Sequence, residues 1–281
     1  MLYLRIFGAM NLANSDFAGS VIKSIPSRYL NRVVDLEIVM PTTVSDIASL
    51  PLLLLNDGQD LASMPLLPLL QQLWKDQVIA PMLIVGIHAG PSRKMEYGVA
   101  GVPDYLGRGA LADKYQDFLQ YELIPYLLKY WSVSEFNDLS IAGFSLGGLS
   151  ALDIAWSNRL PIKRVGVFSG SLWWRCVDQH DPCYSDHAHR IMHGRIRETP
   201  EVPAHLHFFF QCGGLDEKSD RNKNGIIDSI DDTLDLIEEL RQKGFDTTRA
   251  IRYVELSDGK HDVATWARAM PYFLQWGWGI K

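Results

Sequence analysis

The 281-residue sequence predicts an α/β fold built on a doubly wound, mostly parallel sheet. Three observations lead to this prediction. Short apolar runs that end at turn residues recur along the chain, stretches with helical spacing lie between them, and no internal repeat or low-complexity linker interrupts the order. We expect one domain over residues 33–281, preceded by an arm over residues 1–32 that has no clear hydrophobic period.

The predicted strands are short and mostly apolar. Residues 33–41 alternate apolar and charged side chains up to Pro41, as a partly exposed strand does. Residues 52–55 and 82–87 are uninterrupted apolar runs, which is typical of parallel strands covered on both faces. The later strands are expected over residues 139–142, 164–170, 205–213 and 250–256.

Helices are predicted between these strands from apolar residues three and four positions apart. Their expected ranges are 65–74, 112–131, 147–154, 229–243 and 262–276. Pro125 should kink the second of them. Residues 88–110 form a Gly- and Pro-containing loop that is unusually long for a connection without structure of its own, which favours a functional role.

Residues 143–147 read Gly-Phe-Ser-Leu-Gly between a predicted strand and a predicted helix. A serine between two glycines at such a tight turn is the nucleophile elbow of the α/β-hydrolase fold. Ser145 is therefore the predicted nucleophile, and the N–H of Leu146 is predicted to bind the oxyanion of an acyl intermediate. A dinucleotide-binding motif would need Gly at position 145, and a P-loop would need Lys after its second Gly. A purely structural glycine turn is the alternative.

A serine hydroxyl needs a base, and the base needs a group that orients it. In this fold the partners follow in the order serine, acid, histidine, each after a later strand. Of the eight histidines only His261 follows the last predicted strand, so it is the predicted base. Asp216, just beyond the strand over residues 205–213, is the predicted acid. Glu217 is the alternative acid, and a serine–histidine pair without an acid is a third arrangement.

The second oxyanion donor should come from the loop after residues 52–55, which reads Asn-Asp-Gly-Gln-Asp. Gly58 would let the backbone turn so that the Gln59 N–H faces the nucleophile, although an ordinary Asp-Gly turn predicts the same residues. Trp173 and Trp174 follow another strand end. They would either stack on an aromatic or sugar-like substrate or cover the core.

Several stretches together resemble the putative esterase family, which includes esterase D, the enterochelin-type siderophore esterases and the mycolyltransferases. They are DGQD, EYG, YQDFLQYELIP, GFSLGG, SGSLWWR and GKHDVATW, spread over roughly residues 33–276. The resemblance implies hydrolysis of carboxylic esters. The residues it implies are Ser145, His261 and Asp216 for catalysis, Leu146 and Gln59 for the oxyanion, and Tyr97, Trp173 and Trp174 for the substrate. Some siderophore esterases of this group are thought to work without the acid, which leaves the role of Asp216 open.

Residues 220–231 have the ligand spacing of a calcium-binding EF-hand loop. Gly225 stands where that loop needs a sharp turn, while the last ligand is an aspartate instead of the usual glutamate. The predicted metal ligands are Asp220, Asn222, Asn224, Asp228 and Asp231. The predicted Ca²⁺ would be structural, because ester hydrolysis by a serine needs no metal cofactor. A surface loop that caps the following helix is the alternative.

The composition excludes several other classes of function. A net charge of −6 and a pI near 5.7 provide no basic surface for nucleic acid. No run reaches the roughly 20 apolar residues of a membrane helix. Arg5 interrupts the apolar start of the chain, which disfavours a signal peptide, so a cytoplasmic location is expected. The three cysteines lack metal-ligand spacing and are expected to be free thiols, although Cys176 and Cys183 are close enough in sequence to bridge in an oxidising compartment.

The predicted partner is thus a small-molecule ester. The loops over residues 88–110 and 171–195 should shape its pocket, but they carry no code for its acyl and alcohol parts. An acyltransferase of the same fold and a catalytically silent binding protein are the alternative functions.

Overall fold

Eight strands form a single sheet in the computed structural model, which describes residues 18–44 and 46–280. Their order across the sheet is β1-β2-β4-β3-β5-β6-β7-β8. β1 (Ala18–Ser27) and β2 (Arg32–Pro41) are antiparallel, and β2 is antiparallel to β4 (Leu83–Ile87). From β4 onward every pair is parallel. The predicted α/β-hydrolase fold with a mostly parallel, doubly wound sheet is confirmed.

The parallel part of the sheet places one end of each strand at a common edge. Besides β4, this part contains β3 (Leu52–Asn56), β5 (Leu139–Phe144), β6 (Ile162–Phe168), β7 (His207–Leu215) and β8 (Ile251–Lys260). The residues that follow β3, β5, β7 and β8 are the ones for which the sequence predicts chemistry. They meet at this edge because parallel strands end on the same side.

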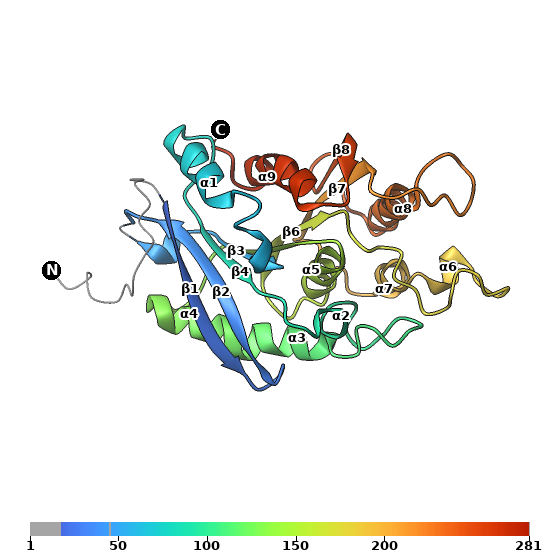
Figure 1. Ribbon diagram of the computed structural model, residues 1–281, viewed down its shortest axis with the longest axis horizontal. Helices are drawn as coiled ribbons and strands as arrows, with labels where there is room; N and C mark the ends of the chain where they lie inside the picture. The colour runs from blue at the N-terminus through green and yellow to red at the C-terminus, as the bar shows by residue number, and fades with distance from the viewer. Residues whose placement is uncertain (1–17, 45, 281) are drawn as a thin grey trace.

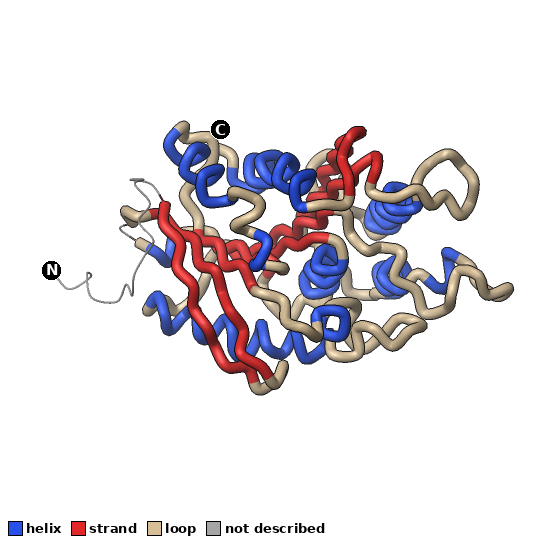
Figure 2. The backbone as a smooth tube through the Cα atoms, in the orientation of Figure 1, coloured by secondary structure: helices blue, strands red, loops and turns tan. Residues whose placement is uncertain are grey.

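Helices cover both faces of the sheet (Figures 1 and 2). On one face lie α1 (Leu66–Lys75) and α9 (Val263–Trp278). On the other face lie α3 (Ala112–Phe118), α4 (Ile124–Trp131), α5 (Leu146–Trp156), α7 (Ile191–Glu198) and α8 (Asp228–Gln242). Two short helices, α2 (Arg93–Glu96) and α6 (Asp186–His189), lie in the loops after β4 and β6.

The two faces carry separate apolar cores. Successive residues of a strand point to opposite faces, so the four leucines of β3 divide between the cores. Leu52 and Leu54 pack with the α3–α8 face, whereas Leu53 and Leu55 pack with α1 and α9. All four are fully buried. This double burial explains why β3 reads as an unbroken apolar run.

One prediction about the first half of the chain needs correction, and a second gains detail. Residues 18–27, expected as part of an arm, form β1; residues 1–17 lie outside the described residues. β1 is an edge strand with a mixed burial pattern, which explains why its sequence shows no clear period. Over residues 112–131 the helix widens into a π-helical turn, Leu119–Leu123, which ends two residues before Pro125. The distortion therefore precedes the proline, which cannot donate a backbone N–H to the preceding turn.

Two general expectations can be compared with the described residues. Within residues 18–44 and 46–280, no helix is long and apolar enough to cross a membrane. The cysteines are free thiols: Cys176 and Cys183 are exposed, and Cys212 is buried against α8.

Candidate active site

Ser145 occupies the sharp turn between β5 and α5. Its backbone has φ 54° and ψ −121°, outside the regions that residues with a side chain favour. The turn is held from both sides, because the Ser145 N–H donates to the Phe168 carbonyl at 2.8 Å and its carbonyl accepts from the Ser171 N–H at 3.1 Å. The strain is therefore supported by β6 and the loop that follows it.

The two glycines of the motif are required by close packing. A Cβ atom on Gly143 would lie 2.3 Å from the carbonyl oxygen of Gly147. A Cβ atom on Gly147 would lie 2.5 Å from Oδ2 of Asp57. Neither contact is compatible with a side chain, so both positions must be glycine for this turn to form.

The hydroxyl of Ser145 meets the predicted base. Its Oγ lies 2.8 Å from Nε2 of His261, which directly follows β8. The imidazole packs edge-on against Trp266 of α9, with 5.4 Å between the ring centroids. A second hydroxyl, that of Ser171, lies 3.4 Å from the Ser145 Oγ. Strand order alone thus brings together two residues that are 116 positions apart.

Asp216 follows β7 at the position beside His261. Leu215 of β7 pairs with Lys260 of β8. Asp216 and His261 are the next residues along these two strands, so they leave the sheet side by side. The carboxylate turns back on its own loop: Oδ2 accepts the Gly213 N–H at 3.0 Å, and Oδ1 has no hydrogen-bond partner among the described residues. Asp216 therefore acts on His261 through its charge, without a hydrogen bond in this structure.

The alternative acid, Glu217, faces the other way. Its carboxylate interacts with the Ser229 backbone and with Ser219, and burial raises its pKa. Of the two acids only Asp216 perturbs the imidazole.

The charges around His261 partly oppose one another. Desolvation by burial lowers the pKa of His261 from its usual value of 6.5, and the positive charge of Arg93 lowers it further. The negative charges of Asp216 and Asp262 raise the pKa, but the net direction is downward. Burial raises the pKa of Asp216, while the Gly213 N–H, Ser169 and His261 hold it down. The resulting imidazole is neutral at neutral pH and is ready to accept a proton.

The two predicted oxyanion donors follow β5 and β3, two neighbouring parallel strands of the sheet. Leu146 is the first residue of α5, so its N–H has no acceptor within the helix. Gln59 lies in a single 3₁₀ turn, Gly58–Asp60, directly after β3. The left-handed residue of this turn is Asp57, with φ 62°. Gly58 is needed for close packing, because its Cβ would lie 2.3 Å from the carbonyl carbon of Gly86.

Arg93 and Asp57 form a partly buried ion pair beneath the elbow that the sequence reasoning missed, with Asp57 buried and Arg93 partly exposed. Arg93 donates from Nε to Asp57 Oδ1 at 2.6 Å and from Nη2 to Asp57 Oδ2 at 2.8 Å. Nη2 also lies 3.4 Å from the Phe144 carbonyl, the last of β5. The sequence feature that could have pointed to Arg93 is its place in the Gly- and Pro-containing loop over residues 88–110.

Two of the three predicted substrate-binding aromatic residues are buried. Tyr97 is 0% exposed, and its hydroxyl accepts the Asp57 N–H at 3.2 Å. Trp174 is 1% exposed and packs against Gly98 and Gly109. Only Trp173 reaches the surface in part, with the Arg108 guanidinium 5.2 Å from its ring. Tyr97 and Trp174 are therefore buried packing residues of the site and expose no surface to a substrate.

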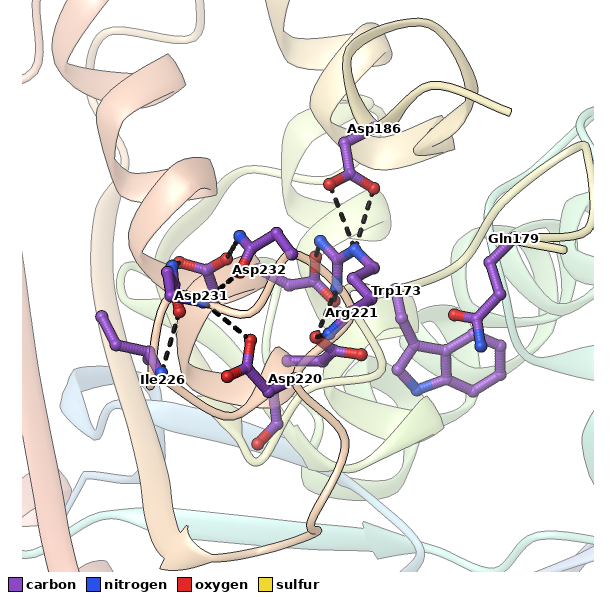
Figure 3. A network of polar contacts seen from close by, with 12 residues as sticks. Trp173, Gln179, Asp186, Asp220, Arg221, Ile226, Asp231 and Asp232 are labelled. Atoms are coloured by element: carbon purple, nitrogen blue, oxygen red, sulfur yellow. Dashed lines mark hydrogen bonds and ion pairs between the residues drawn. The ribbon is translucent and has the colours of Figure 1, made fainter. Parts of the chain in front are cut away.

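The loop over residues 220–231 is closed by its own hydrogen bonds (Figure 3). Asp220 accepts the N–H groups of Asn224 and Gly225 at 3.1 and 2.9 Å, and Gly225 has φ 87°. The side-chain amides of Asn222 and Asn224 donate to Asp231 at 2.6 and 3.2 Å. Asp228 turns away to Arg221. Within the described residues, no three His, Cys, Asp or Glu side chains are grouped to hold a metal ion.

Known proteins share this architecture. A family model described as Putative esterase matches residues 27–276. The enterobactin esterase FES from Shigella flexneri, solved with 2,3-di-hydroxy-N-benzoyl-serine, has a TM-score of 0.68 and 21% identity over 91% of this chain and 58% of that chain. This chain thus spans 58% of the length of that relative.

Two further solved structures are similar over most of their own length. A ferulic acid esterase has a TM-score of 0.68 and 20% identity, over 93% of this chain and 97% of that chain. An IroE-like serine hydrolase from Shewanella oneidensis has a TM-score of 0.67 and 19% identity, over 92% and 79%. At these identities the likeness establishes the fold. A search of curated protein sequences gives no match.

Proposed function

The chain belongs to the putative esterase family, and we propose that it is a serine ester hydrolase that works through an acyl-enzyme formed on Ser145. The observation that carries the proposal is the 2.8 Å contact between the Ser145 Oγ and His261 Nε2 at a strained turn. A hydroxyl in that position can lose its proton to the imidazole as it attacks a carbonyl carbon.

The proposed reaction has two halves. Ser145 Oγ attacks the ester carbonyl while His261 takes its proton, and the tetrahedral intermediate then expels the alcohol, which receives that proton. In the second half water attacks the acyl-enzyme, again with His261 as base, and releases the carboxylic acid. The N–H groups of Leu146 and Gln59 are the proposed donors to the oxyanion, and Asp216 the proposed charge that stabilises the imidazolium.

The proposed substrate is a small carboxylic ester, of siderophore type or another kind. Two of the similar structures are described as an enterobactin esterase and a ferulic acid esterase, which both support an ester of a small acid. Reaction of the folded protein with a fluorophosphonate probe tests the mechanism; a folded protein that stays unlabelled contradicts it. Product analysis with an added alcohol separates the two reaction types, because transfer that outcompetes hydrolysis would make the protein an acyltransferase.

Arg93 is proposed as a positioning residue for the oxyanion loop. It fixes Asp57, which stands two residues before Gln59 and packs against Gly147. Replacement of Arg93 by Met should lower kcat by about tenfold to a hundredfold, since small misplacements of donors cost about that much. Loss of the positive charge should also raise the pKa of His261 and move the acid limb of the kcat/KM profile to higher pH.

Two variants check this prediction by pH-rate profiles and kcat. Arg93→Lys keeps the charge but not the bidentate contact with Asp57. Compared with Arg93→Met, it should return the acid limb of the kcat/KM profile to its wild-type position but recover less of kcat. Arg241→Met removes an exposed ion pair with Glu238 and should change neither. An Arg93→Met enzyme with wild-type kcat and an unmoved limb would disprove the positioning role.

We also propose that the loop over residues 220–231 takes a structural Ca²⁺ ion. Asp220 bonded to the N–H groups at loop positions five and six, with a left-handed Gly225, supports this. The amides of Asn222 and Asn224 would turn over to present their oxygens, beside the carboxylates of Asp220 and Asp231.

Thermal unfolding with and without Ca²⁺ tests the metal proposal. At a Ca²⁺ concentration of 100 Kd the added stability is about 2.7 kcal/mol, which corresponds to a rise in Tm of roughly 5–10 °C. Asp220→Ala should abolish the rise. Asp181→Ala, which removes a similar loop carboxylate bonded to the Cys183 N–H, should not. The absence of both a Tm shift and a calorimetric signal would reject the site.

A further inference from the structure

Asn56 ends a strand that otherwise consists of leucines. β3 reads Leu-Leu-Leu-Leu-Asn, and its last residue is as buried as the four before it, with 0% of its surface exposed. A fifth apolar residue would continue this run, whereas burial of an amide is unfavourable unless the amide is hydrogen-bonded. The hydrogen bonds of Asn56 therefore explain why a polar side chain stands at this place in the core.

Both ends of the Asn56 amide are hydrogen-bonded. Nδ2 donates to the Gly147 carbonyl oxygen at 2.8 Å, and Oδ1 accepts the Tyr115 hydroxyl at 2.6 Å. A carbonyl oxygen can only accept, so the atom that faces Gly147 must be the amide nitrogen, and the orientation of the amide is fixed. Burial raises the pKa of Tyr115, which keeps its hydroxyl protonated as a donor.

The Asn56 amide joins the two segments that carry the proposed oxyanion donors. Gly147 directly follows Leu146 at the start of α5, and Asn56 stands three residues before Gln59. Gly147 packs so closely on the end of β3 that a Cβ atom there would lie 3.2 Å from the Cβ atom of Asn56. A change in this contact would therefore move Leu146 relative to Gln59.

Tyr115 supports the amide from α3. It is 1% exposed, and its ring packs edge-on against Tyr97 with 5.1 Å between the ring centroids. The Tyr97 hydroxyl in turn accepts the N–H of Asp57, the residue after Asn56. Two buried tyrosines from different segments thus fix the end of β3, and neither exposes a surface to a substrate.

We propose that Asn56, supported by Tyr115, is a positioning residue that sets the distance between the two oxyanion donors. This inference rests on the proposed ester hydrolysis at Ser145. Donors must lie within about 2.7–3.1 Å of the developing oxyanion, and a misplacement of about 1 Å costs roughly a hundredfold in rate. The oxyanion forms only on the way to the transition state, so loss of the Asn56 bonds should lower kcat without weakening substrate binding.

The test compares Asn56→Leu and Tyr115→Phe with the wild type in the hydrolysis of phenyl acetate. Leucine continues the run of β3 but removes both hydrogen bonds, whereas phenylalanine removes only the hydroxyl. We expect kcat to fall about tenfold to a hundredfold in Asn56→Leu and less in Tyr115→Phe, with KM within about threefold of wild type. The rate of labelling by a fluorophosphonate should fall by the same factor as kcat, because the phosphonyl oxygen enters the same oxyanion site.

A double-mutant cycle and a matched control separate positioning from a general loss of stability. If Tyr115 acts only through Asn56, adding Tyr115→Phe to Asn56→Leu should lower kcat no further, whereas independent effects would multiply. Gln116→Met is the control, because Gln116 is another buried amide of α3 and donates to Asp153, further along α5, at 2.7 Å. It should lower Tm but leave kcat and the labelling rate unchanged.

A folded Asn56→Leu protein with wild-type kcat and labelling would overturn the positioning role and leave the esterase mechanism intact. A loss of kcat that Gln116→Met shares, or losses that multiply in the double variant, would overturn it as well. If Asn56→Leu does not fold, Tyr115→Phe decides, and unchanged kcat and labelling in that variant count against the role. A folded wild type that neither hydrolyses phenyl acetate nor reacts with the fluorophosphonate would instead contradict the proposed function, and the positioning role with it.

Discussion

Replacement of Ser145 by alanine should lower kcat/KM for ester hydrolysis by roughly 10⁴- to 10⁶-fold and abolish labelling by a fluorophosphonate. The reason is that the nucleophilic oxygen is removed while the oxyanion donors and the fold remain. The effect should appear in kcat, because the hydroxyl forms its bond only on the way to the transition state.

Ser171→Ala is the matched control for this experiment. Its hydroxyl lies only 3.4 Å from the Ser145 Oγ, but His261 bonds to Ser145. We expect Ser171→Ala to keep labelling and most of the activity. If labelling instead followed Ser171, the assignment of the nucleophile would be wrong.

Replacement of His261 by alanine should cost about 10⁴-fold or more in kcat, since no other base lies within hydrogen-bond distance of the Ser145 Oγ among the described residues. Steady-state kinetics of the folded variant measure this loss. A variant that retains more than a tenth of the activity would show that another group takes the proton.

Asp216→Asn provides the informative comparison with that variant. A carboxylate bonded to the catalytic imidazole is worth about 10⁴-fold. Asp216 interacts with His261 only through its charge in this structure, so we expect a much smaller loss, of about ten- to a hundredfold. The same variant should lower the pKa of His261 and shift the acid limb of the rate profile to lower pH. A loss equal to that of His261→Ala would indicate a hydrogen-bonded triad during catalysis.

The sequence predicts the part of the site that depends on strand order. Ser145 and His261 could be paired in advance because a parallel sheet brings the ends of its strands to one edge, and a short motif identifies one of those ends. β3, β4 and β5 could also be predicted from their apolar runs, since these strands are buried on both faces. Such features require only local sequence and the rules of sheet topology.

Other features depend on contacts that local sequence does not record. Arg93 reaches Asp57 across 36 residues, and although Asp57 stands in the DGQD stretch, nothing in that motif indicates its partner. Tyr97 was expected at the substrate, but its hydroxyl is needed beneath the elbow, where its ring packs against Tyr115. β1 escapes detection because an edge strand with one partner has little hydrophobic patterning.

The division of the four β3 leucines between two cores has a consequence for how this chain can vary. Inserting or deleting one residue within β3 would send each leucine to the wrong side of the sheet and would rotate Asn56 out of its bond to the Gly147 carbonyl. A change in the register of β3 would therefore also disturb the turn that carries Ser145. Changes in length are tolerable only in the segments outside it.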